Sequence, residues 1–230
     1  MREVLCGTAP EWLINAFSRY GVKLSCVGEC TALPKPVMGH IDLMALQLGT
    51  VHFIAPEAED LFSRYWDFTK ETISEHLGST YPEDVKLSAE RVESYLLCKV
   101  GSISEGVKKY ALQHNFKILP VKQGYIRCSL CRCSEEAFIT DDPSIASTLG
   151  NHTRVELLQI SKGDIVLPGY PYGFIGGASG KIGDTLYFFG SLDSLRDADK
   201  VKAFLGDRHI SYVSLSKKHP LTDIGGIMDA

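Results

Sequence analysis

Apolar residues recur along the chain in short runs, which are separated by polar segments rich in glycine and proline. Runs of this length between turn residues predict buried β-strands. Strands are expected at residues 4–6, 22–27, 51–55, 95–100, 116–121, 137–140, 155–160, 185–190 and 210–215. Segments with helical patterning alternate with these runs, so the sequence predicts an α/β protein.

Helix start and stop signals lie between the expected strands. The first helix should begin after Thr8, a candidate N-cap, and end near Gly21. The longest should begin at Pro56 and run to about Leu77, with Gly78 as its stop, and the strand expected after it is weak or absent. The remaining helices are expected at 104–115, in a short segment opened by the Asp-Pro pair at 142–143, and at about 195–205.

One pattern recurs five times. Each unit consists of a glycine-containing or acidic loop-strand, a hydrophobic strand, a helix and a further strand. The loop-strands are 39–43, 83–87, 124–128, 173–177 and a partial 222–226, with starts 44, 41, 49 and 49 residues apart. The N-terminal helix and strand would complete the fifth unit, so the chain ends would meet and close a ring. Repeats of this length stack on each other to bury a shared core.

The repeat predicts one domain spanning residues 1–230, a five-fold pseudosymmetric β/α propeller built from ββαβ units. The alternative is a doubly wound parallel sheet. Against that alternative, no G-x-G-x-x-G motif opens a helix, and the glycine-rich segment 173–184 leads into a strand. All-β propellers have similar periods, but their blades contain no helix. The ring is therefore the favoured architecture.

Composition limits the classes of partner. The 230 residues carry a net charge of −4 without a basic stripe, which argues against nucleic acid as a partner. No run of 18 apolar residues and no signal-peptide pattern occurs, so neither a membrane span nor secretion is expected. Seven cysteines, an odd number, favour reduced thiols in the cytoplasm. We expect no cofactor and a small-molecule ligand; the oligomeric state is left open.

The strongest candidate chemistry lies in the loop-strands. His40 and Asp42 are two residues apart on a strand-like segment, so their side chains should share a face. If every loop-strand points to the centre of the ring, Asp84, Cys128 and Asp223 would converge on the same place. A purely structural histidine at the end of a strand is the alternative for His40.

Cys128, Cys131 and Cys133 form C-x2-C-x-C, a spacing that invites a metal or redox interpretation. On a strand, Cys128 would face away from the other two, and no glycine or proline between them makes the turn of a zinc knuckle. We therefore expect no metal site. Cys6, Cys98, Cys131 and Cys133 are expected to be small buried apolar residues.

Four segments resemble the motifs of one enzyme superfamily. The segment "GHIDLMALQLG" resembles the H-x-D strand of agmatine and arginine deiminases, and "QGYIRCSLC" is similar to the Gly-x-x-x-Cys strand of dimethylarginine dimethylaminohydrolase. The segment "GFIGGASGKIGDTLYFFG" resembles the strand pair that carries substrate-binding carboxylates, and "LTDIGG" the acidic Gly-Gly motif. The chain thus resembles the guanidine-group-modifying enzymes of the pentein fold, and most of all an uncharacterised bacterial family assigned to that fold. The order of the motifs implies a circular permutation relative to the deiminases.

The resemblance implies a hydrolase or transferase that acts on a guanidine, amidine or amide C–N bond. Cys128 would be the nucleophile, and His40 would be the acid/base. Arg127, the neighbour of Cys128 in the sequence, would lower the thiol pKa, although its side chain should point to the opposite side of the strand. The residues expected at the substrate are Asp42, Asp84, Asp223, Gly176 and Gly177, the two glycines standing where the enzymes carry a carboxylate. The alternative is a catalytically inactive domain of the same fold that binds a small molecule or a protein.

Overall fold

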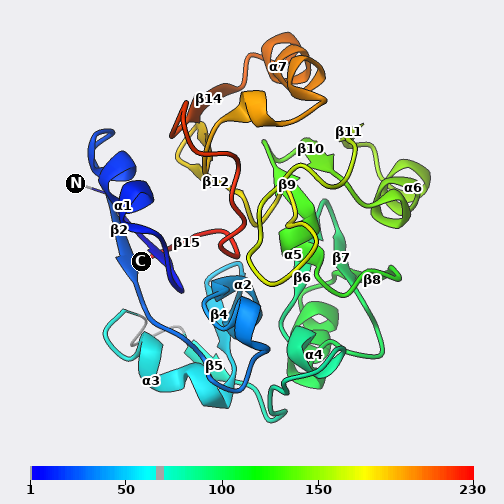
Figure 1. The fold of residues 1–230 in the computed structure, drawn as a ribbon. Coiled ribbons are helices and arrows are strands. Elements are labelled where there is room, and N and C mark those ends of the chain that lie inside the picture. Colours follow the sequence, from blue (N-terminus) through cyan, green and yellow to red (C-terminus); the bar gives the residue numbers. More distant parts are fainter. Residues whose placement is uncertain (1, 66–69) are drawn as a thin grey trace.

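The computed structural model describes residues 2–65 and 70–230 and shows five small three-stranded sheets around a common centre (Figure 1). The sheets have the strand orders β15-β1-β2, β3-β4-β5, β6-β7-β8, β9-β10-β11 and β12-β13-β14. In each sheet the middle strand pairs antiparallel with the strand named first and parallel with the strand named last. The strand named first precedes the middle strand in the sequence in four sheets, whereas β15 comes from the C-terminal end of the chain. This arrangement confirms the α/β ring of five ββαβ units.

The strands are β1 Arg2–Cys6, β2 Val22–Cys26, β3 Ala45–Leu48, β4 Val51–Ile54, β5 Lys70–Thr72, β6 Ala89–Val92, β7 Tyr95–Cys98, β8 Lys117–Pro120, β9 Leu130–Arg132, β10 Ala137–Thr140, β11 Glu156–Gln159, β12 Ser179–Ile182, β13 Thr185–Phe188, β14 Ser211–Ser214 and β15 Met228–Asp229. The α-helices are α1 Glu11–Ser18, α2 Ile41–Met44, α3 Glu59–Phe62, α4 Glu105–Gln113, α5 Ile126–Ser129, α6 Pro143–His152 and α7 Ala198–Asp207. Short 3-10 turns are η1 Lys35–Val37, η2 Pro56–Ala58, η3 Glu83–Val85 and η4 Leu192–Ser194.

Each unit follows from its local sequence. A parallel pair of strands needs a crossover, and the helix between the second and third strands supplies it. In α4, Val107 and Ala111 are buried and lie four residues apart on one face, while the Ser104 hydroxyl caps the helix by accepting a hydrogen bond from the Gly106 N–H at 3.2 Å. The expected Asp142 cap is present on α6: its carboxylate accepts hydrogen bonds from two backbone N–H groups of the first turn.

The middle strands form the core of the ring. Phe53, Phe138 and Phe188 lie on β4, β10 and β13 and are each 0% exposed. Strands covered on both faces become continuous apolar runs, which explains why the sequence pattern located them so well. Burying one such side chain stabilises the fold by roughly 2–3 kcal/mol.

Both chain ends build the fifth unit. β15 pairs antiparallel with β1, with Val4 opposite Asp229, and β1 pairs parallel with β2. The predicted meeting of the N- and C-terminal segments is confirmed, as a circularly permuted ring requires (Figure 1).

Two helix predictions were wrong. The segment expected to be the longest helix contains η2 and α3, and residues 66–69 of that prediction lie outside the described residues. Its second half includes β5, which pairs parallel with β4. β5 is an edge strand of three mostly exposed polar residues, so it has no apolar alternation to reveal it. Thr8 does not cap α1, which begins after Pro10; the Thr8 N–H instead donates to the Gly39 carbonyl at 3.1 Å.

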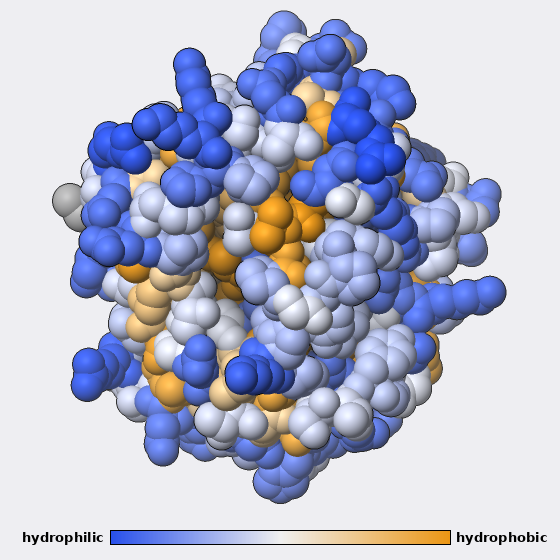
Figure 2. All heavy atoms as spheres, in the orientation of Figure 1, coloured by the Kyte–Doolittle hydropathy of each residue, from blue (hydrophilic) through white to orange (hydrophobic). Residues whose placement is uncertain are grey.

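The predicted loop-strands also differ from the structure. Three of these segments contain a helical turn instead, namely α2, η3 and α5, and each turn leads directly or within a few residues into β3, β6 or β9. A helical turn rises only about 1.5 Å per residue against about 3.3 Å in a strand, so more side chains are gathered in the crowded middle of the ring. Figure 2 shows apolar side chains near the middle of one face of the molecule, within a rim of hydrophilic residues.

Candidate active site

His40 and Asp42 are positioned by the start of α2. His40 is the N-cap, with extended backbone angles (φ −89°, ψ 105°), and Asp42 lies in the first turn. The His40 Nδ1 atom is 3.9 Å from Asp42 Oδ1. Gly225 packs behind the histidine at φ +77°, where an added Cβ would lie 2.5 Å from the His40 Cα. The two side chains therefore meet as predicted, although a helical turn rather than a strand brings them together.

Cys128 enters the same place from α5, two units further along the chain. Its thiol donates a hydrogen bond to Asp42 Oδ2 at 2.7 Å, and its Sγ lies 3.8 Å from His40 Nδ1. The Cys128 side chain is buried among these groups, and the residue is only 2% exposed. The Gly177 N–H donates to the Cys128 carbonyl at 2.9 Å and ties the third segment to the fourth.

Asp223 completes the group from the fifth segment. Its Oδ1 lies 3.8 Å from His40 Nε2 and accepts a hydrogen bond from the Gly225 N–H at 3.0 Å. Its Oδ2 accepts from the Phe174 N–H at 2.9 Å. The four side chains of His40, Asp42, Cys128 and Asp223 are called the Cys–His cluster below.

Burial dominates the electrostatics of the Cys–His cluster. It raises the pKa of the Asp42 carboxyl, against the opposing influence of His40. It also raises the pKa of the Cys128 thiol well above its usual value, and the charges of Asp42 and Asp223 raise it further. Arg127 lowers this thiol pKa, as the sequence predicted, but its effect is the smallest of these. The thiol of the free protein is therefore protonated at neutral pH.

Asp84 lies in a different environment from the one predicted. Its Oδ2 accepts a hydrogen bond from the Tyr125 hydroxyl at 2.5 Å, and its Oδ1 is buried without a hydrogen-bond partner among the described residues. Burial raises the pKa of the Asp84 carboxyl. The Tyr125 ring lies 5.7 Å from that of Tyr81 and 6.3 Å from that of Phe174, whose N–H binds Asp223. Asp84 is thus part of an aromatic group next to the cluster.

The sequence analysis missed this aromatic group. Tyr172 extends it, with its ring centroid 5.9 Å from that of Phe174. The available signal was the run "GYPYGF" at 169–174, immediately before the glycine segment. Asp141 was also missed: it follows β10, is 2% exposed, and burial raises its pKa to about 7.

Gly176 and Gly177 lie where the chain packs most tightly against the cluster. A Cβ at Gly176 would lie 2.1 Å from the Arg127 carbonyl oxygen, and one at Gly177 would lie 1.9 Å from Asp223 Oδ1. Only glycine fits at either position without moving these atoms. The close approach that the two glycines permit is to α5 and to Asp223.

The ligand atoms of His40, Asp42 and Cys128 all lie within 4.8 Å of one another, a spacing at which one metal ion could bind all three. The C-x2-C-x-C triad does not gather in this way. Cys131 Sγ lies 3.9 Å from Cys133 Sγ, whereas Cys128 faces the cluster. Cys6, Cys98, Cys131 and Cys133 are all buried, as expected of small apolar residues.

Comparison with known proteins defines the class. The fold is similar to that of a dimethylarginine dimethylaminohydrolase from Pseudomonas aeruginosa, solved as a cysteine-to-serine mutant with citrulline, with a TM-score of 0.57 at 8% identity over 94% of this chain and 92% of that one. It is also similar to an arginine dihydrolase from cyanobacteria (TM-score 0.55, 12% identity, 93% of this chain and 36% of that one) and to an agmatine deiminase from C. jejuni (TM-score 0.51, 10% identity, 93% and 75%). The protein therefore has the pentein fold of the guanidine-modifying enzymes.

The chain belongs to the family of unknown function DUF6873, whose model matches residues 5–228. Among curated proteins, none matches the sequence significantly. In the described part of the chain, no helix is both long and apolar enough to cross a membrane.

Proposed function

We propose that this protein is a cysteine-dependent hydrolase or transferase that acts on the C–N bond of a guanidine, amidine or amide. The observation that carries the proposal is the convergence of Cys128, His40 and Asp42: a nucleophile lies 3.8 Å from an acid/base and 2.7 Å from a carboxylate. Proteins with a similar fold supply further support. One of them was solved with citrulline, and another as an adduct with S-methyl-L-thiocitrulline.

The carboxylates of the site favour a cationic substrate. Asp42, Asp84 and Asp223 are at most 3% exposed, and in the described part of the chain none of them forms an ion pair with lysine or arginine. Burial of a carboxylate without a cation disfavours its charged form, which a guanidinium or amidinium would restore. A planar cation can also donate a pair of parallel hydrogen bonds to a carboxylate. Asp42, Asp84 and Asp223, with backbone beside Gly176 and Gly177, are the proposed substrate contacts.

The chemistry follows from the positions of the side chains. Cys128 Sγ attacks the central carbon of the cation and forms an S–C bond, and its proton passes to His40. His40 then protonates the departing amine as the C–N bond breaks. Neutral His40 next removes a proton from water, which adds to the same carbon. Collapse of that adduct breaks the S–C bond, releasing a carbonyl product and the free thiol. A transferase would differ only in using an amine in place of water.

The protonated resting thiol has a consequence for this mechanism. Burial and two neighbouring carboxylates raise the pKa of Cys128, so a neutral reagent should find a poor nucleophile. A cation bound next to Cys128 and Asp42 offsets the negative charge of the carboxylates and favours the thiolate. The substrate itself would therefore activate Cys128.

Two reagents of nearly equal shape test this activation. 2-Chloroacetamidine is cationic and 2-chloroacetamide is neutral, and each loses chloride as it alkylates a thiol. Cys26, an exposed cysteine, serves as the internal control. We expect the ratio of labelling rates, cationic reagent over neutral reagent, to be at least tenfold higher at Cys128 than at Cys26. Peptide mass mapping of labelling rates measures both sites in one sample. His40→Ala should leave this preference in place, while Cys128→Ala should abolish turnover of any substrate found, with its far-UV spectrum unchanged.

The second candidate is a catalytically inactive ring that binds a cationic small molecule. The raised pKa of Cys128 favours it, because a thiol that never reacts does not need to ionise. Equal preference of Cys128 and Cys26 for the two reagents would contradict the enzyme. Binding of an amidine to the wild type with no release of amine would support this second candidate.

A further inference from the structure

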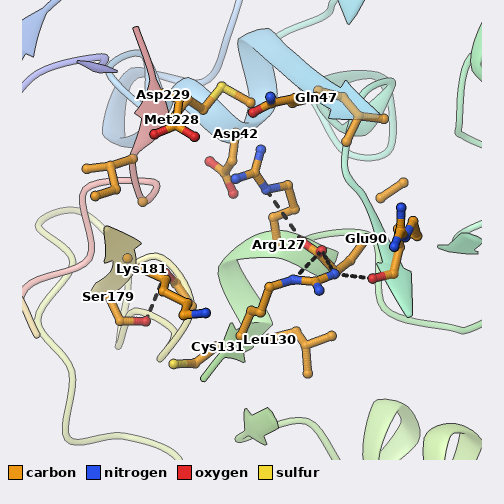
Figure 3. A pocket seen from close by; sticks show the side chains of 18 of the residues that line it. Asp42, Gln47, Glu90, Arg127, Leu130, Cys131, Ser179, Lys181, Met228 and Asp229 are labelled. Atoms are coloured by element: carbon orange, nitrogen blue, oxygen red, sulfur yellow. Dashed lines mark hydrogen bonds and ion pairs between the residues drawn. The ribbon is translucent and has the colours of Figure 1, made fainter. Parts of the chain in front are cut away.

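A cavity of about 430 Å³ is lined by residues of all five units (Figure 3). Its walls come from the first-named strand of every sheet, β3, β6, β9, β12 and β15, and it extends to Gly49 and Glu135 in the hairpin turns that follow β3 and β9. Asp42 and Arg127 also line it. His40, Cys128 and Asp223 do not line it. We call it the hairpin-end cavity.

The acidic side chains on the strand walls of the hairpin-end cavity, unlike Asp42, are paired with arginines. Glu90 accepts a hydrogen bond from Arg132 Nη2 at 2.6 Å, and Glu135 Oε1 lies 3.1 Å from Arg132 Nη1. Asp229 accepts from Arg2 Nη2 at 3.0 Å. These pairs leave no acidic group on the strand walls that requires a cationic ligand.

Two basic side chains of the same cavity are less fully paired than Arg132. Arg127 donates no hydrogen bond among the described residues, and its one ion pair joins Nε to Glu90 Oε2 at 3.8 Å, across an acid already bound to Arg132. Lys181, on β12, has neither a hydrogen bond nor an ion pair in that part of the chain. Figure 3 shows both side chains at the cavity wall. Positive charges that line one cavity and are incompletely paired favour a bound anion.

We propose that the hairpin-end cavity binds a small carboxylate-bearing molecule, with its carboxylate on Arg127 and Lys181. A guanidinium fork matches a planar carboxylate in two hydrogen bonds, and a lysine adds a point charge. Leu46, Leu130 and Met228 line the same space and suit a short carbon skeleton. The volume is in the range of small-molecule sites. The paired acids on the walls repel a compact dianion such as sulfate more strongly than a carboxylate.

Calorimetric titration of the full chain at low chloride tests the proposal. The probes are succinate and butyrate, with butyramide as the uncharged isostere of butyrate and sulfate as an anion without a carboxylate. We expect saturable binding of at least one carboxylate, no binding of butyramide, and at least tenfold weaker binding of sulfate. Arg127→Met and Lys181→Met should each weaken carboxylate binding at least tenfold, whereas Lys109→Met, at an exposed lysine on α4, should not.

The proposal is overturned if neither carboxylate binds saturably, if sulfate binds equally well, or if binding survives both substitutions. Lys181 makes no polar contact within the described residues, so Lys181→Met tests the site even if Arg127→Met fails to fold. The assay measures binding at Arg127 and Lys181 and does not require Cys128 to react. Its failure would leave the proposed enzyme activity untouched, and failure of that activity would leave this site standing.

Discussion

The motif segments and the walls of the hairpin-end cavity differ in whether their carboxylates have a cationic partner. At the end where the motif segments lie, Asp42, Asp84 and Asp141 are at most 2% exposed and, in the described part of the chain, have no lysine or arginine within ion-pair distance. At the hairpin end, Glu90 and Glu135 are bound to Arg132. Burial raises the pKa values of the first three, whereas the second pair is matched with a fixed positive charge.

The acids of the motif end lack a cationic partner, whereas those of the hairpin end already have one. An acid buried without a cation costs stability, which a fold retains where a bound cation removes the cost. An acid already paired with arginine is neutralised by the protein itself and does not require a cationic ligand. The hairpin end has the opposite imbalance: in the described part of the chain Lys181 has no ion pair, and Arg127 has only the 3.8 Å contact with Glu90, which is the basis of the anion site proposed above.

The largest expected loss of stability is that of Gly177→Ala, which crowds the motif end. The new methyl would overlap Asp223 Oδ1, and Asp223 is itself held by the Gly225 and Phe174 N–H groups. We expect a loss of about 3 kcal/mol or more in unfolding free energy, measured by urea denaturation. Gly150→Ala, on the exposed side of α6 with no atom within 4 Å of its new Cβ, is the control and should stabilise by about 0.5–1 kcal/mol. Similar losses in both variants would refute the packing argument.

Asp223→Ala compares a buried carboxylate directly with a paired one. The substitution leaves the N–H groups of Gly225 and Phe174 without their acceptor, at a cost of about 2–3 kcal/mol. Glu135→Ala removes a side chain that is 71% exposed from its pair with Arg132, which should cost no more than about 0.5–1 kcal/mol. Urea denaturation of both variants at pH 7 gives the comparison. An equal cost at the two positions would mean that the two ends do not differ as described.

The last prediction is a pH dependence of stability at Asp141. Burial raises its pKa to about 7 in the folded chain, from an ordinary value of 3.8, so folding takes up a proton between these values. The destabilisation is absent below about pH 4, grows as the pH rises, and is complete above pH 7. Asp141→Asn should therefore match the wild type in unfolding free energy near pH 4 and exceed it by about 4 kcal/mol at pH 8. Thermal unfolding across this range measures the difference, and a constant difference at every pH would contradict it.

Much of the ring could be predicted because each repeat unit has recognisable local sequence patterns. The apolar middle strands, the Asp142 cap and the spacing of the motif segments are all visible without a structure. The exposed edge strand β5 was missed because strands of this kind carry almost no apolar signal. The helical form of the motif segments was missed because their conformation depends on the crowded ring centre, which no local pattern encodes.

The sequence by itself determined which residues stand at equivalent points of the repeat, and so brought His40, Asp42, Cys128 and Asp223 together. Only the tertiary structure decided what surrounds each of them. It placed Asp84 against Tyr125, filled the space at Gly176 and Gly177 with protein, and raised the pKa of Cys128 where the neighbouring arginine had predicted the reverse. The physical reason is that periodicity sets direction and register along a chain, whereas desolvation and charge depend on every segment that packs around a group.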